Sequence, residues 1–136
     1  MNRRAFLAIS TATMLSAPAW AGGDLVTYRP GIIESALAEG KTVFVDYFAP
    51  WCSTCRTQER RVQELRAENP AYDRNLVFVR VDWDTYRTHE VVTGRAIPRR
   101  STLIVLRGKD ELGRIVAGTG KAEIRALMDA GLATQG

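Results

Sequence analysis

Hydrophobic and polar positions follow two different periodicities along the chain. Thr42–Phe48 is β-branched or aromatic at every position except Asp46, and Leu76–Asp82 is apolar over most of its length. Such continuous apolar runs are typical of strands that are buried on both faces of a sheet. Between residues 31 and 40, apolar side chains instead recur at helical spacing, which predicts a short amphipathic helix.

The rest of the chain continues this alternation of helices and strands. The other predicted elements are a helix over 52–69, a helix over 85–93, strands over 102–108 and 112–118, and a helix over 121–132. A turn containing Gly108 joins the last two strands into an antiparallel hairpin. This order predicts an α/β fold with a mixed central sheet and helices on both faces.

The N-terminal residues have the layout of a bacterial export signal. Arg3-Arg4 precedes a weakly apolar run over 5–17, and the small residues of Ala19-Trp20-Ala21 follow it. The apolar run is too short for a bilayer core of about 30 Å, so we expect cleavage after Ala21 and not a permanent anchor. The paired arginines favour the twin-arginine route; a general secretory signal and an ordinary N-terminal helix are the alternatives.

Removal of residues 1–21 has two consequences for the rest of the protein. It leaves 115 of the 136 residues, enough for one domain over 22–136 that begins with a short lead-in to residue 30. It also lowers the formal net charge from +4 to +2, because the signal contains two arginines and no acid. No basic run is interleaved with aromatic residues, so we expect no nucleic-acid partner.

Both cysteines of the chain lie in the stretch FAPWCSTC, as Cys52 and Cys55. A bridge between them closes almost no loop and constrains the unfolded chain little, which favours a chemical role. One helical turn brings their Cα atoms to about the 5–6 Å that a disulfide requires. Cys52 falls where a strand ends and a helix begins, a position that stabilises a thiolate, whereas Cys55 should be shielded.

Two other interpretations of the cysteine pair remain open at this point. The cysteines could be inert core residues, or they could bind a metal ion. Zinc would require further ligands, and the mature chain offers only carboxylates and His89, which we expect to be a surface residue of a helix. Two soft thiolates would suit Cu(I).

The chain resembles the thioredoxin family. The resemblance rests on VDYFAPWCSTC over 45–55, VRVD over 79–82, GRAIP over 94–98, and the closing hairpin and helix, and it covers nearly all of residues 31–133. It implies the thioredoxin fold, with a mixed sheet flanked by helices on both faces. It also implies dithiol–disulfide exchange without a bound cofactor and without a metal.

The resemblance implies a role for each residue of the motif. Cys52 would be the nucleophile, Cys55 the resolving thiol, and Trp51 a cover for the site. Asp46, on the buried strand, would help to move the proton of Cys55, and burial should raise its pKa towards neutrality. A polar residue at a strand end is the alternative interpretation of Asp46.

The loop before the third long strand departs from the family pattern. Pro98 is similar to the cis-proline of the family, with the Ile97 backbone pairing with an extended client; an ordinary turn proline is the alternative. In the family a threonine then leads directly into the strand, whereas here 99–101 intervene. We expect Arg99 to lie near the Cys52 sulfur, unless this arginine points into solvent.

These observations predict an exported, periplasmic thiol–disulfide oxidoreductase. The expected partners are client proteins with disulfides or thiols and a membrane or periplasmic thiol electron donor, and we expect a monomer. Asp46 and the absence of a histidine beside Cys55 favour the reducing direction, whereas Arg99 near the thiolate would favour oxidation. A thioredoxin-fold module that delivers copper is the alternative function, and a purely structural domain is a third.

Overall fold

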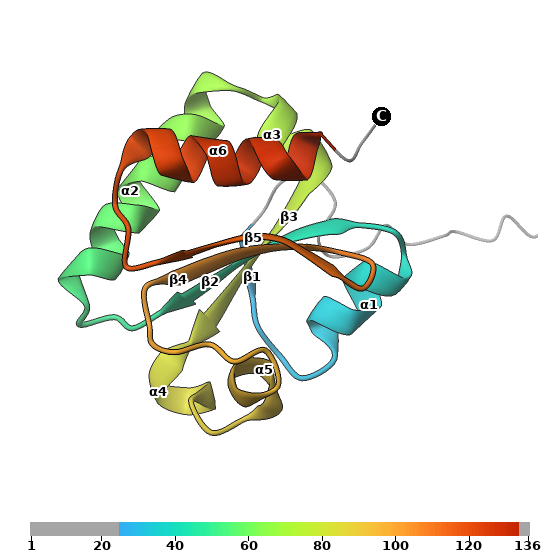
Figure 1. The fold of residues 1–136 in the computed structure, drawn as a ribbon, viewed down its shortest axis with the longest axis vertical. Helices are drawn as coiled ribbons and strands as arrows, with labels where there is room; N and C mark the ends of the chain where they lie inside the picture. The colour runs from blue at the N-terminus through green and yellow to red at the C-terminus, as the bar shows by residue number, and fades with distance from the viewer. Residues whose placement is uncertain (1–24, 134–136) are drawn as a thin grey trace, which may run out of the picture.

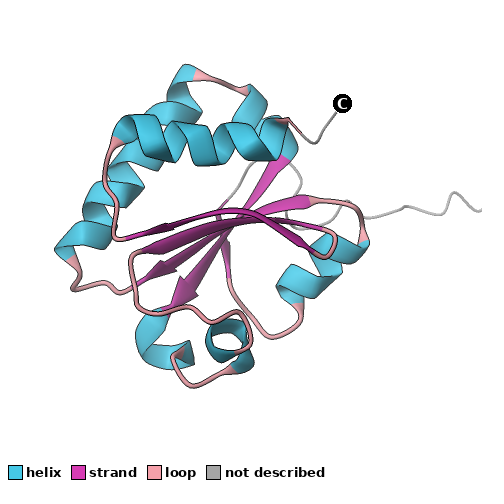
Figure 2. Ribbon diagram, in the orientation of Figure 1, coloured by secondary structure: helices cyan, strands magenta, loops and turns pink. Residues whose placement is uncertain are grey.

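The computed structural model describes residues 25–133, so the predicted export signal over 1–21 lies outside the described part of the chain. A five-stranded sheet forms the centre, with strand order β1-β3-β2-β4-β5 (Figure 1). Helices cover both faces of this sheet (Figure 2). The predicted mixed sheet between two helical layers is thereby confirmed.

The central strand β2 (Thr42–Phe48) lies between β3 (Leu76–Asp82) and β4 (Thr102–Arg107). It is parallel to β3 and antiparallel to β4, and β5 (Asp110–Val116) completes the antiparallel side. Every residue of β2 except Phe48 is buried, as its continuous apolar pattern predicts.

The sheet separates the two larger apolar clusters of the core. On one face, α2 (Ser53–Glu68), α3 (Ala71–Asn75) and α6 (Lys121–Leu132) pack against Phe44 and Phe78. On the other face, α1 (Ile32–Ala38), α4 (Trp83–Tyr86) and α5 (Glu90–Thr93) enclose a second cluster.

Three predictions about the elements need correction. The segment expected to be a lead-in contains β1 (Leu25–Thr27), which pairs in parallel with β3 at the sheet edge. A short helix, α3, forms directly after Pro70, and the Asn69 side chain accepts a hydrogen bond from the Ala71 N–H.

The third correction concerns the single helix predicted over 85–93, which is two short helices, α4 and α5. His89 lies between them and not on a helical surface. Its Nδ1 accepts a hydrogen bond from the Val91 N–H at 3.1 Å, so this histidine caps α5.

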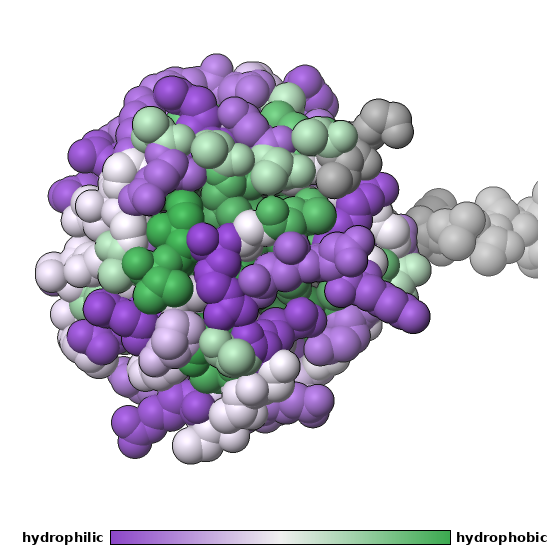
Figure 3. Space-filling model, viewed as in Figure 1, coloured by the Kyte–Doolittle hydropathy of each residue, from purple (hydrophilic) through white to green (hydrophobic). Residues whose placement is uncertain are grey.

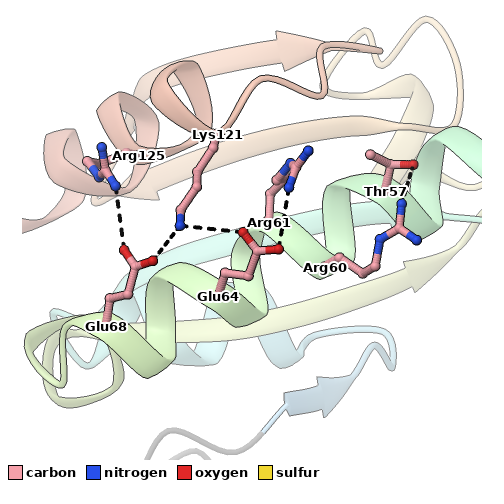
Figure 4. A network of polar contacts seen from close by, with 7 residues as sticks. All are labelled: Thr57, Arg60, Arg61, Glu64, Glu68, Lys121 and Arg125. Carbon is pink, nitrogen blue, oxygen red and sulfur yellow. Dashed lines mark hydrogen bonds and ion pairs between the residues drawn. The ribbon is translucent and has the colours of Figure 1, made fainter.

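Exposed ion pairs join α2 to α6 (Figure 4). Lys121 contacts Glu64 at 3.5 Å and Glu68 at shorter range, and Arg125 contacts Glu68 at 3.5 Å. Exposed pairs of this kind contribute only about 0–1 kcal/mol each, so the apolar cluster beneath them holds the two helices together.

On the face shown in Figure 3, apolar residues gather near the middle, and hydrophilic side chains lie around them. Within residues 25–133, no helix is both long and apolar enough to cross a membrane.

Candidate active site

The cysteine pair lies at the junction of β2 and α2. Cys52 is the N-cap residue of α2, and its sulfur accepts a hydrogen bond from the Cys55 backbone N–H at 3.2 Å. The Cys52 N–H in turn donates to the Ala49 carbonyl at 3.1 Å and so fixes the tight connection after the strand. Both cysteines are free thiols, placed at the positive end of a 16-residue helix.

Burial does not distinguish the two thiols, contrary to the expectation that only Cys55 would be shielded. The exposed fraction is 4% for Cys52 and 3% for Cys55. Their pKa values nevertheless differ. Burial raises the pKa of Cys52, but hydrogen bonds from Cys55, Ser101 and Arg100 outweigh this and lower that pKa to about 7. Burial and the neighbouring Cys52 instead raise the pKa of Cys55.

Ser101 contacts both sulfurs and was not identified from the sequence. Its Oγ lies 3.2 Å from Cys52 Sγ and 3.1 Å from Cys55 Sγ. The residue precedes Thr102, the first residue of β4, and its backbone φ is +64°. The signal that could have identified it is the threonine at the start of β4. In the family pattern, a proline beside the cysteines directly precedes that threonine. Counting back from Thr102 therefore places Ser101, and not Pro98, at the position of that proline.

Pro98 does not occupy the position that the resemblance implied. The described residues contain no cis peptide bond, so the bond before Pro98 is trans, and the Pro98 side chain is exposed. Ile97 is 5% exposed, and its N–H already donates to the Val92 carbonyl at 3.0 Å. That N–H is therefore not free to pair with a client. Ser101, three residues after Pro98, contacts the cysteines instead.

The arginine beside Cys52 is Arg100, where the sequence led us to expect Arg99. The Arg99 Nε donates to the Arg100 carbonyl at 3.0 Å, which directs this guanidinium back onto its own loop. Arg100 instead lies over the Trp51 ring, 4.3 Å from its centroid, and it lowers the pKa of Cys52. The expected cation is thus present, one residue later than predicted.

Trp51 forms the exposed rim of the site. Its side chain is 56% exposed, and its Nε1 donates to Asp84 Oδ2 at 2.8 Å. Asp84 and Arg100 therefore hold the ring from two sides. An exposed but oriented aromatic ring of this kind offers a contact surface to another protein.

Asp46 lies on β2 directly opposite Arg80 of β3. Its Oδ2 is 3.9 Å from Arg80 Nε, its Oδ1 has no hydrogen-bond partner among the described residues, and the residue is 7% exposed. Burial raises the pKa of Asp46 to about 7; Arg80 opposes this shift and Glu59 adds to it. The predicted rise of this pKa towards neutrality agrees with the environment of the side chain.

Gln58 is a second residue that sequence reasoning missed. It is 0% exposed on α2, and its Nε2 donates to the Ser101 carbonyl at 2.8 Å and to the Gly118 carbonyl at 2.9 Å. The side chain therefore joins the catalytic helix to the loop before β4 and to the segment after β5. A glutamine on a charge-rich helix gives no sequence signal for this function.

The cysteines offer two soft ligands to an ion such as Cu(I). Within residues 25–133, no group of three or more histidine, cysteine or acidic side chains is arranged to hold a metal ion.

Comparisons with known proteins identify the family. The family described as Thioredoxin matches residues 28–130. Thioredoxin of Echinococcus granulosus is 30% identical over 98 residues, which are 72% of this chain and 85% of the relative. Thioredoxin of Mycobacterium bovis is 34% identical over 96 residues, which cover 68% and 77%. The chain belongs to the thioredoxin family, and it is a protein-disulfide oxidoreductase.

Solved structures agree with this assignment. Trxlp from Edwardsiella tarda EIB202 superposes with a TM-score of 0.67 at 31% identity, covering 76% of this chain and 98% of that one. Thioredoxin from Trypanosoma brucei brucei gives a TM-score of 0.68 at 21% identity, covering 87% and 99%. The latter likeness supports the fold alone.

Proposed function

We propose that this protein is a periplasmic thiol–disulfide oxidoreductase that reduces disulfides of client proteins through Cys52 and Cys55. The observation that carries the proposal is the difference between the two thiols, since the pKa of Cys52 is lowered to about 7 and that of Cys55 is raised. One thiol is thus partly ionised at neutral pH while the other keeps its proton.

The exchange then proceeds in two steps. The Cys52 thiolate attacks a client disulfide, forms a mixed disulfide and releases one client sulfur. Cys55 next attacks the Cys52 sulfur, so the Cys52–Cys55 disulfide forms and the second client sulfur leaves. Two electrons pass to the client. In the reverse direction the oxidised pair would donate its disulfide to client thiols.

The lowered but near-neutral pKa of Cys52 favours the reducing direction. A value of about 7 is that of a reducing thioredoxin, whereas a strongly oxidising relative reaches about 3.5. Asp46, with a pKa of about 7, can take up and release a proton at neutral pH. We assign to it the exchange of the Cys55 proton with solvent.

The client-facing surface comprises Trp51 and Arg100, with Arg99 and Pro98 on the same loop. Trp51 supplies apolar contact, and Arg100 supplies positive charge beside the reacting sulfur. Clients with acidic residues around their cysteines should therefore react faster, and salt should reduce this preference.

The proposed compartment rests on the N-terminal sequence alone. Arg3-Arg4, the short apolar run and the Ala19-Trp20-Ala21 site support export. Disulfides persist in the periplasm, so a reductase there must be re-reduced by a thiol donor in the periplasm or at the membrane.

The function is tested with purified protein and insulin as the disulfide client, in the presence of dithiothreitol. We expect catalysed reduction by the wild type and none by Cys52→Ser. A Cu(I) titration under the same conditions tests the copper-delivery alternative. Tight copper binding without catalysis would favour that alternative, and capture of periplasmic proteins on a Cys55→Ser variant would identify the clients.

A further inference from the structure

The hydroxyl of Ser101 is within hydrogen-bond reach of both reacting sulfurs. It is 3.2 Å from Cys52 Sγ and 3.1 Å from Cys55 Sγ, and the residue is 0% exposed. A serine hydroxyl has a single proton to donate, and this proton turns about the Cβ–Oγ bond to suit its acceptor. Ser101 can therefore donate to either sulfur without moving a heavier atom, but it cannot donate to both at once.

The position of the hydroxyl oxygen is fixed by its surroundings. The Ser101 N–H donates to the Tyr47 carbonyl at 2.7 Å, and its carbonyl accepts from the Ala117 N–H at 2.9 Å and from Gln58 Nε2 at 2.8 Å. These bonds hold a residue with a side chain at a φ of +64°, a backbone that persists only where neighbours determine it. The oxygen is thus held in place while its proton remains free to turn.

The negative charge moves from one sulfur to the other during the exchange. Before the first step it lies on Cys52, whose thiolate attacks the client disulfide. In the mixed disulfide the Cys52 sulfur is neutral, and Cys55 must become a thiolate before it attacks. A hydrogen bond to a charged acceptor is stronger than one to a neutral acceptor, so the hydroxyl should donate to whichever sulfur carries the charge.

We propose that Ser101 is a catalytic residue whose hydroxyl donates to the Cys52 thiolate in the first step and to the Cys55 thiolate in the second. The serine keeps its proton throughout. The proton of Cys55 leaves by the route that the proposed function assigns to Asp46, and the Cys55 sulfur then bonds to the Cys52 sulfur. The client sulfur departs with the bonding electron pair on the side of Cys52 opposite Cys55, and it takes its proton from solvent.

The other groups that act on the sulfurs do not have this double effect. Burial raises the pKa of both thiols, and Ser101 opposes this rise at both. Arg100 opposes it at Cys52 and the Ala49 backbone at Cys55, while the two thiols shift each other's pKa in opposite directions. Loss of the serine hydroxyl should therefore raise the pKa of either thiol, whereas loss of the Arg100 guanidinium should raise that of Cys52.

The first test titrates each thiol alone, in proteins that carry Cys55→Ala or Cys52→Ala. The second of these substitutions leaves no charge at position 52, which imitates the neutral Cys52 sulfur of the mixed disulfide. Each protein is compared with its Ser101→Ala and Ser101→Gly derivatives, since glycine adopts a positive φ without strain. Ser53→Ala is the matched control, because it removes an exposed hydroxyl from the dipeptide between the cysteines.

Thiolate absorbance as a function of pH gives the pKa of the remaining thiol. We expect both Ser101 substitutions to raise it by about one pH unit or more in both proteins. Ser53→Ala should change neither value, and Arg100→Gln should raise the value for Cys52 alone. A rise at Cys52 without one at Cys55 would show a donor that serves one sulfur and would overturn the proposal, as would unchanged values at both.

The second test separates loss of the hydroxyl from damage to the site. The Cys55→Ala protein stops at the mixed disulfide, so its rate with a small alkyl disulfide is that of the Cys52 attack. A higher pKa leaves less thiolate at neutral pH, but a rise of one unit makes each thiolate about threefold more nucleophilic. Adding Ser101→Gly should therefore slow the attack about two- to threefold at about pH 7 and accelerate it by a similar factor at about pH 9.5.

Slowing at both pH values would show a structural role for Ser101 and overturn the proposal. The inference rests on the exchange reaction of the proposed function, but not on its compartment or direction. The two can fail separately. A wild type that releases no thiol from the disulfide would overturn the exchange reaction itself, whereas the two titrations decide between a shared and a single-sulfur donor in either case.

Discussion

The Arg100 guanidinium lies over the Trp51 ring, 4.3 Å from its centroid, and the same arginine lowers the pKa of Cys52. One side chain thus links the exposed rim of the site to the attacking sulfur. A cation in contact with an aromatic face is attracted by the ring, which keeps the guanidinium beside the thiolate. The charge that tunes Cys52 and the surface that meets a client are therefore coupled through a single residue.

Arg100→Gln should raise the pKa of Cys52, because it removes a donor that stabilises the thiolate. The disulfide should become less oxidising, by about 30 mV for each unit by which the pKa rises. Thiolate absorbance as a function of pH measures the first effect, and equilibration with glutathione measures the second.

The matched control is Arg99→Gln, which removes the neighbouring guanidinium that bonds to the Arg100 carbonyl. We expect it to leave both quantities near the wild-type values. If Arg99→Gln shifted the Cys52 pKa more than Arg100→Gln did, the assignment of the cation to Arg100 would be wrong.

Asp46→Asn should increase stability at neutral pH. The folded-state pKa of Asp46 is raised from 3.8 to about 7, so the folded protein binds more protons than the unfolded chain between these values. Wild type therefore loses stability as the pH rises from about 4 to 7. The variant does not undergo this loss. At pH 7 and above, its free energy of unfolding should exceed that of wild type by at most about 4 kcal/mol. The gain should be smaller than this bound because the asparagine amide no longer pairs as a charge with Arg80.

Urea unfolding at about pH 4 and pH 7.5 measures this difference. Asp110→Asn, which changes an exposed carboxylate, is the control and should show little pH-dependent gain. Insulin turnover by Asp46→Asn should fall at the same time. Turnover at the wild-type rate across about pH 6 to 8 would contradict the proton-transfer role of this residue.

The two thiols should react with iodoacetamide at different rates although they are equally buried. Only the thiolate reacts, and the pKa of Cys52 is lowered to about 7 while that of Cys55 is raised. Peptide mapping of the reduced protein after short labelling at pH 7 should therefore find the label mainly on Cys52. Its labelling rate should rise with a midpoint near pH 7, and equal rates at the two positions would refute the assigned roles.

Export should depend on the paired arginines. In a bacterial host with a twin-arginine pathway, the wild type should be found in the periplasmic fraction with Gly22 as its first residue. The double variant Arg3→Lys, Arg4→Lys should remain in the cytoplasm as the full-length precursor. Normal export of this double variant would favour a general secretory signal instead.

The sequence by itself determined the elements that frame the site. Thr42–Phe48 and Leu76–Asp82 are strands with the predicted bounds, and Lys121–Leu132 is the predicted helix. Each has a periodicity that is long and regular enough to be recognised locally. The position of Cys52 at the start of a helix followed from the same local pattern. The short elements β1 and α3 had no such pattern, because three to five residues are too few to show a period.

Only the tertiary structure decided which side chains surround the sulfurs. Ser101 is 46 positions from Cys55, and Gln58 reaches across 43 positions to the Ser101 carbonyl. These contacts depend on the register between β2 and β4 and on a left-handed backbone at Ser101, neither of which is encoded in a local pattern. The path of residues 98–101 leaves Pro98 exposed and places Arg100, and not Arg99, beside the Trp51 ring. A family motif gives the order of residues along the chain, but the path of the loop through space determines which of them meets the thiolate.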